Sequence, residues 1–388
     1  MYSSRTAEVL AVRQQSGTCE ELLVRLREGD AKALNYLPLT GPAAAGDFVV
    51  LNTTAVELGL GSGGYHFVVL NLSRPERSAA GAGHIMKLRY TPLQVKVLAV
   101  EEEASPYHEI MKEAVSLDGM PVIAAELHSM LAPLALALQH FRPGTRLVYV
   151  MTDGGALPAF LSRAAAALKA RGLLAGVVTC GHAFGGDLEA VTVYSGLLAA
   201  KHVLRADAAI VCMGPGVAGT GTPFGFSGLE VGDNLNRICS LQGRPIALPR
   251  LSFADPRPRH RGFSHHTLRA LVDAALAEVD VPLPALAGEE AAYLAGQIEA
   301  CGLAQKHLLY YYDNLSLDCL APDYALCRTM GRTPEEDPVF FLAAVATALH
   351  TAKILAGSIT EDAAGERRPV SDHAAACAKS SATQPLCR

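Results

Sequence analysis

The order of hydrophobic and polar positions divides the chain into two parts. Residues 5–100 contain β-branched or alternating apolar runs, such as 47–58 and 65–72, which Gly, Pro and Asn interrupt. From about residue 118, short apolar runs alternate with helical stretches, the pattern of a parallel sheet with crossover helices. We therefore predict a β-rich barrel or sandwich domain over 1–100 and an α/β domain with C-terminal helices over 101–359.

The second part predicts a Rossmann-like, doubly wound sheet of about five strands. The apolar runs are 121–126, 146–151, 174–180, 208–213 and 244–253, and each precedes a loop. Helices are expected at 130–141, 158–171, 188–204 and 267–279, with two more at 289–301 and 338–356. Residues 360–388 are rich in Ala, Ser and Asp, and we predict that they are disordered.

Composition narrows the class of protein. Half of the 388 residues are apolar and 18% are charged, which excludes a largely disordered chain. A net charge of −5 argues against a general nucleic-acid-binding protein. Nine cysteines without a C-x-x-C pair fit a reducing cytoplasm. The apolar stretches 121–141 and 338–357 carry polar and charged residues, so we expect core segments and no membrane association. Homo-oligomer formation is left open.

The loop at 252–267 is the most informative segment for function. Residues 244–271 hold six arginines and one acidic residue. Because strand ends of a parallel sheet meet at one edge, this loop is expected there, where arginine forks suit a phosphate or carboxylate. We assign anion binding to Arg257, Arg259 and Arg261, and a divalent-metal site to Asp255, His260, His265 and His266. The alternative is a solvated basic loop that caps the next helix.

Two other strand-end loops carry candidate groups. Gly216, Gly219, Gly221 and Thr222 could form a backbone nest for an oxyanion, or merely a flexible connection. It is not a phosphate-binding P-loop, because Pro223 stands where Gly-Lys-Ser/Thr would follow. The literal G-x-G-x-x-G at 59–64 precedes a strand and not a helix, so it is not a dinucleotide fingerprint.

Carboxylates and histidines after the second and third strands complete the candidate catalytic set. Asp153, His182, Asp187 and His265 are the candidates for general acid–base chemistry or metal ligation. For Asp187 alone, capping of a helix at 188–204 is the favoured interpretation. Glu126 and His128 are expected to form a buried hydrogen-bonded pair.

Four strings together resemble a known family: TDGGALP, GHAFGGDLEAVTVYSGL, MGPGVAGTGT and SFADPRPRHRGFSHHT. They look like a bacterial family designated domain of unknown function 3866, over about residues 5–355. The resemblance implies a bacterial cytoplasmic protein. It carries over no catalytic residue.

The pattern favours an enzyme that acts on a small anionic, phosphorylated or nucleotide-like substrate. A divalent metal ion, if present, makes hydrolysis through an activated water the simplest reaction. A non-enzymatic regulator that binds a nucleotide or other phosphorylated metabolite is the alternative. A Rossmann-like transferase is a third interpretation, weakened by the missing fingerprint.

Overall fold

The structure is a computed structural model that describes residues 2–16 and 18–359. It contains two compact units, Met1–Leu98 and the chain from Ala99 onward. The division falls at residue 98, close to the expected boundary at residue 100. The predicted tail at 360–388 lies outside the described residues, and the two units are treated separately below.

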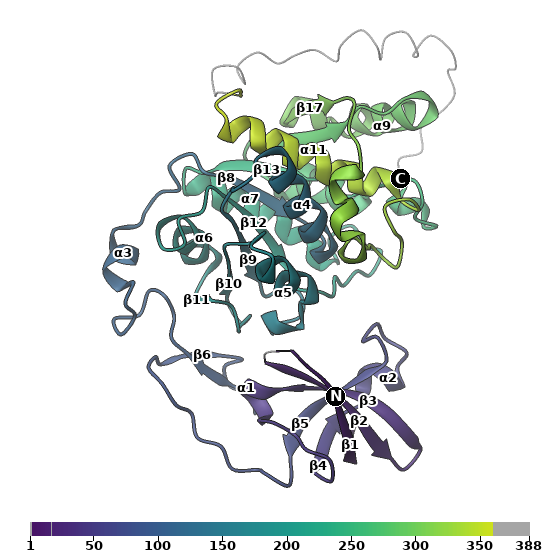
Figure 1. Cartoon of the computed structure of the whole chain (residues 1–388). Helices are drawn as coiled ribbons and strands as arrows, with labels where there is room; N and C mark the ends of the chain where they lie inside the picture. The colour runs from purple at the N-terminus through teal and green to yellow at the C-terminus, as the bar shows by residue number, and fades with distance from the viewer. Residues whose placement is uncertain (1, 17, 360–388) are drawn as a thin grey trace. The chain divides into compact units, whose positions relative to one another are not determined.

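The first unit is a closed five-stranded barrel, which confirms the predicted β-rich domain (Figure 1). Its strands are β1 (Ser4–Ser16), β2 (Cys19–Leu26), β3 (Gly29–Tyr36), β4 (Phe48–Asn52) and β5 (Tyr65–Asn71), in the order β1-β2-β3-β5-β4. Alternate apolar residues point inward, as the period of two requires, and fill the barrel. The unit also contains two short helices, α1 (Leu37–Thr40) and α2 (Thr54–Glu57). Strands β6 (Ile85–Lys87) and β7 (Val95–Val97) pair as a separate hairpin. The glycine-rich run at 59–64 leads into β5, as expected.

The second unit is built on an eight-stranded, wholly parallel sheet with the order β11-β10-β9-β12-β8-β13-β16-β17. The strands are β8 (Pro121–Ala125), β9 (Leu147–Thr152), β10 (Gly176–Cys180), β11 (Leu188–Ala190), β12 (Ala208–Met213), β13 (Arg244–Leu248), β16 (Asp280–Pro284) and β17 (Leu308–Tyr312). Every residue of β8, β9 and β12 is buried. Continuous apolar runs of this kind are typical of parallel strands that are covered on both faces.

The sheet confirms the predicted α/β class, but it has three more strands than the expected five. One difference is a correction: residues 188–204 are not a single helix. Leu188–Ala190 is the edge strand β11, and α6 (Val193–His202) starts only after Thr192, whose side chain caps it. The helix propensity of 188–204 predicts one helix there, and the three-residue strand is too short to change that prediction.

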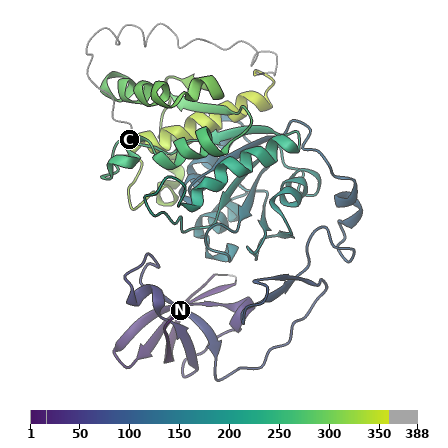
Figure 2. The ribbon, with the colours of Figure 1, turned by 180° about the vertical axis from the view of Figure 1, so that it is seen from behind.

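Two helical layers cover the sheet (Figures 1 and 2). On one face α4 (Leu131–Phe141) packs against α5 (Arg163–Ala170) and α11 (Pro338–Leu355). On the other face α6 packs against α7 (Glu230–Ser240), which packs against residues 270–274. The remaining helices are α3 (His108–Glu113), α8 (His265–Arg269), α9 (Gly288–Cys301) and α10 (Leu303–Lys306).

Helix α11 is long and apolar enough to cross a membrane, but 67% of it is buried inside the unit. It packs on α4 and β16, so it is a core helix, as the polar residues in this stretch predict.

The strand order reverses direction at the middle of the sheet. From β8 the chain proceeds to β9, β10 and β11 on one side, and from β12 it proceeds to β13, β16 and β17 on the other. The loops that leave the neighbouring strands β8 and β13 therefore lead to opposite faces. Ligands of open parallel sheets bind at such a reversal, beyond the carboxyl ends of the strands.

Candidate metal centre

The segment that follows β13 builds the candidate site. Strands β14 (Leu251–Ser252) and β15 (Gly262–Phe263) pair as a short antiparallel hairpin, so residues 253–261 form a closed loop. Ser264 then caps α8, because its Oγ accepts the backbone N–H of His266 at 3.2 Å. This cap fixes the start of the helix and places His265 and His266 at its first two positions.

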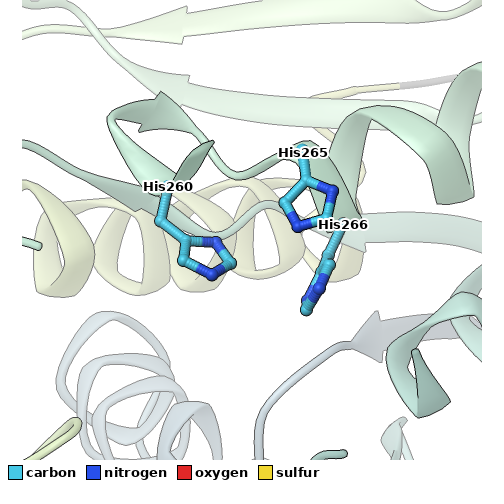
Figure 3. A group of neighbouring side chains, drawn as sticks. All are labelled: His260, His265 and His266. Atoms are coloured by element: carbon cyan, nitrogen blue, oxygen red, sulfur yellow. The ribbon is translucent and has the colours of Figure 1, made fainter. Parts of the chain in front are cut away.

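Three imidazole rings converge at this point, those of His260, His265 and His266 (Figure 3). One ring nitrogen from each lies within 4.8 Å of those of the other two. Around a tetrahedral zinc ion, with metal–nitrogen bonds of about 2.0–2.1 Å, the nitrogens would be roughly 3.3 Å apart.

Outer partners orient two of the rings. His266 Nδ1 lies 2.8 Å from Glu126 Oε1, and His260 Nδ1 lies 2.8 Å from Ser264 Oγ. A carboxylate only accepts, so Nδ1 of His266 carries a proton, and in the neutral ring Nε2 is the nitrogen that can bind a metal ion. A carboxylate behind a histidine is the usual outer partner of a metal ligand.

His265 supplies the third nitrogen. Its Nε2 is buried and forms no hydrogen bond with any described residue. Buried polar atoms are nearly always paired, so this ring nitrogen beside two other imidazoles is a candidate ligand for a metal ion. Three protein nitrogens with an open fourth position are typical of a catalytic zinc site, whereas structural zinc sites are closed.

The environment keeps two of these histidines neutral. Burial lowers the pKa of His260 to about 3, and the charges of Arg250 and Arg257 act in the same direction. Burial also lowers the pKa of His265 to about 4, and the charges of His266 and Arg259 lower it further. Neutral imidazoles offer the lone pairs that a metal ion requires.

A buried chain of ion pairs is connected to the histidines through Glu126. Arg250 bridges Glu126 at 3.2 Å and Asp255 at 3.3 Å, and its side chain is 5% exposed. Burial would raise the pKa of Asp255, but hydrogen bonds and charge from Arg257 and Arg250 lower it far below its usual value. Asp255 accepts two bonds from Arg257 at 2.9 and 2.8 Å. Asp255 is therefore engaged by arginines, and it is not in the histidine group that could hold a metal ion.

The glycine-rich loop after β12 reaches the same place. Phe226, at the end of this loop, stacks on His266 with ring centroids 4.0 Å apart. A Cβ at Gly219 would lie 3.4 Å from Nε2 of His266, so glycine keeps the space beside that nitrogen open. Gly216 and Gly221 have φ values of 109° and 79°, which only glycine adopts easily. Gly216 and Thr222 lie on the exposed part of the same loop.

The three predicted anion-binding arginines have different surroundings. Arg257 is held by Asp255, and the guanidinium of Arg261 lies over the rings of Phe253 and Tyr293. Arg259 is exposed, and its Nε lies 3.4 Å from Nε2 of His260.

The other predicted catalytic residues do not all meet the histidines. Asp153 Oδ2 accepts the backbone N–H of His182 at 2.8 Å, so these two lie together beyond β9 and β10. Asp187 lies elsewhere: its loop folds back along β10, where Asp187 Oδ2 accepts the N–H of Val177 at 2.8 Å and Oδ1 pairs with Lys169. Val177 is near the amino end of β10, so Asp187 binds the backbone at the amino edge of the sheet, opposite the site. It does not cap a helix.

Some site residues were not assigned from the sequence. The expected Glu126–His128 pair is wrong: Glu126 binds His266, and His128 Nε2 lies 2.8 Å from Ser162 Oγ. Arg250 was counted in the basic segment, but its role beneath Glu126 depends on pairing between β8 and β13. Glu230, at the start of α7, accepts a bond from Thr152 at 2.6 Å, and burial and the charge of Asp153 raise its pKa to about 7.

The helix that carries His265 and His266 is irregular. Residues 265–269 are α-helical, and residues 270–274 form a π-helical turn closed by the Ala275 N–H to Ala270 carbonyl bond of 2.8 Å. Such turns are frequent at functional sites.

These features define a two-unit protein with a β-barrel, a parallel α/β unit and a candidate three-histidine metal centre. The chain belongs to the family of proteins of unknown function DUF3866, whose model matches residues 32–348. This match confirms the resemblance drawn from the four strings. No curated protein and no solved structure matches the chain.

Proposed function

We propose that this protein is a metal-dependent hydrolase acting on a small anionic substrate. The observation that carries the proposal is the convergence of His260, His265 and His266, with a buried nitrogen on His265 that has no hydrogen-bond partner in the described part of the chain. This refines the expectation from sequence, which also counted Asp255 among the ligands. Imidazole ligands suit zinc, iron, nickel or copper better than magnesium or calcium.

The reaction class follows from the open position that three ligands would leave. A water on the fourth position of a zinc ion has a pKa of about 7, compared with 15.7 in bulk water, and is a nucleophile near neutral pH. Glu126 would hold His266 in the orientation and tautomer that ligation needs. The arginine-rich loop and the glycine-rich loop border the histidines and favour an anionic substrate.

The cysteines support a reducing compartment, and we propose the cytoplasm as the location. Cys212, Cys239, Cys301, Cys319 and Cys327 are free thiols, and Cys212 and Cys327 are fully buried. Free thiols in this number are typical of proteins kept in reducing surroundings.

The first test is the metal content of the tag-free protein, measured by mass spectrometry after supplementation with zinc, manganese or iron. We expect close to one ion per chain in the wild-type protein and less than a tenth of that in His265→Ala. His140→Ala removes an exposed histidine near the end of α4 and should retain the metal. A wild-type protein without metal, or a folded His265→Ala variant that keeps it, would overturn the metal centre.

The second test addresses hydrolysis. Release of inorganic phosphate would be followed over a panel of nucleotides and sugar phosphates with wild-type protein and His265→Ala. The proposal expects turnover that disappears in the variant. A metal-loaded protein that shifts its melting temperature with a panel compound but releases no phosphate from it would instead be a binding protein.

A further inference from the structure

The three arginines of the 252–267 loop are not equivalent, and only Arg259 donates a hydrogen bond to a histidine of the site. Arg257 is fixed by two bonds to Asp255, and Arg261 is spread over two aromatic rings at 5.4 Å. Arg259 is exposed and makes no ion pair with any carboxylate in the described part of the chain. In the described part of the chain, its hydrogen bond goes to Nε2 of His260, the nitrogen that would face the metal, so a bound metal ion would replace this bond.

Among the described residues, Arg259 and Arg261 have no carboxylate partner, and Arg259 is the one that contacts a histidine of the site. Three buried or partly buried arginines and three carboxylates form one connected network and cancel, namely Arg250, Arg257 and Arg332 with Glu126, Asp255 and Asp337. A divalent metal ion on the histidines would then stand beside an uncompensated guanidinium. Two neighbouring cations repel, and an anion that lies between them removes the repulsion.

Two glycines of one exposed loop lie beside His266 and Arg259. Gly219 lies against the ring of His266, and a Cβ at Gly221 would be 3.8 Å from Nη1 of Arg259. One exposed loop without side chains at these two positions therefore runs from the histidines to the guanidinium.

We propose that the ligand of this site is a phosphate group that bridges the metal ion and Arg259. This inference rests on the proposed metal centre and names the substrate class. A phosphate dianion offsets the charge of both cations better than a carboxylate does. Its tetrahedral oxygens can bind the metal and the planar guanidinium fork at the same time.

The test is the binding of inorganic phosphate by calorimetry to the full chain, with and without its metal. We expect Arg259→Gln to weaken phosphate binding about tenfold to a hundredfold, as for the loss of a hydrogen bond between charged groups. Arg259→Lys should recover part of the affinity. Arg261→Gln is the matched control, two residues away on the same loop, and should change the affinity less than twofold. Both glutamine variants should keep the metal.

Each outcome separates the two proposals. A wild-type protein that binds no metal would overturn the proposed metal centre. Retained metal with no phosphate binding at millimolar concentration, or equal binding by wild-type and Arg259→Gln protein, would overturn the bridging role alone. Acetate bound as tightly as phosphate, with the same dependence on Arg259, would show that the ligand is a carboxylate. A melting curve for each variant confirms that it is folded.

Discussion

The α/β unit contains two buried trios of the same chemical composition at opposite edges of its sheet. At the carboxyl edge, Glu126 lies 2.8 Å from His266 and 3.2 Å from Arg250. At the amino edge, Asp280 lies 3.0 Å from His350 and 2.8 Å from Arg244. Burial would raise the pKa of each carboxyl, but the histidine and arginine lower both.

The trios differ in what the second nitrogen of the histidine does. Nδ1 of His350 lies 2.7 Å from the hydroxyl of Tyr312, so both ring nitrogens of this buried residue are used within the protein. His266 instead directs its second nitrogen toward Gly219 and two further imidazoles. A buried histidine–carboxylate–arginine trio is therefore not in itself a functional site. The candidate site is indicated by the convergence of three imidazoles, one of which, His265, has a buried Nε2 without a hydrogen-bond partner among the described residues.

The largest expected effect on stability is at the amino edge. His350→Ala should lower the free energy of unfolding by about 3–5 kcal/mol, because it leaves a cavity beneath α11 and removes a partner of the buried Asp280. Urea unfolding measures this change. The metal content should stay at the wild-type level. A loss of metal together with stability would contradict the separation of the two trios.

Glu230 shows what happens to a partly buried carboxyl without such a trio. Its pKa is raised to about 7 from 4.5, so the folded state binds more protons than the unfolded state between these values. Stability therefore falls as pH rises through this interval and is constant above it, with a total cost of about 3 kcal/mol. Glu230→Gln should remove the cost and still accept the bond from Thr152.

We expect Glu230→Gln to stabilise the protein by about 2 kcal/mol more at pH 8.5 than at pH 5.5. Urea unfolding at the two pH values measures the difference. An equal effect at both would mean that Glu230 ionises normally in the folded protein.

Glu126→Gln tests the carboxyl-edge trio itself. The amide keeps the size of the side chain but loses the charge that holds His266 in position. We expect the metal affinity to fall about tenfold to a hundredfold, as for other outer partners of ligating histidines. Competition with a metal-binding dye measures the affinity. Asp280→Asn is the matched change in the other trio, and an equal loss of affinity there would contradict a local role for Glu126.

The sequence predicts the histidines of this site better than their partners. His260, His265 and His266 lie within seven residues of one another on one strand-end loop, so residue type and position suffice to group them. Glu126 is 140 residues from His266, and they meet only because β8 and β13 are neighbours in register, with Ala125 opposite Leu248. Adjacency in the sequence instead suggested His128 as its partner, and that pairing is wrong.

The missed strands have local causes. In β16, Pro282 and Pro284 argue against a central strand, because proline cannot donate to a ladder. In β11 the whole strand is Leu188–Ala190, too short to show a period. Asp187 was placed at the carboxyl edge because the loop before it was expected to lead straight into a helix. The loop returns along β10 instead.

The smallest expected effect tests whether metal binding needs the space beside Nε2 of His266, which Gly219 borders. In Gly219→Ala the new Cβ would lie 3.3 Å from Cε1 and 3.4 Å from Nε2 of His266, tighter than most such contacts. The loop around Gly219 is exposed and can shift by a few tenths of an ångström, so the fold should be unaffected. We expect the metal affinity to fall less than tenfold, measured by the same competition assay. Gly216→Ala is the control, since a Cβ there meets nothing within 4 Å and only the positive φ is strained. If Gly216→Ala lowered the metal affinity as much as Gly219→Ala, the effect would come from the conformation of the loop. A larger effect at Gly219 alone would locate the metal between this glycine and the ring, where the trio at the amino edge has a tyrosine hydroxyl.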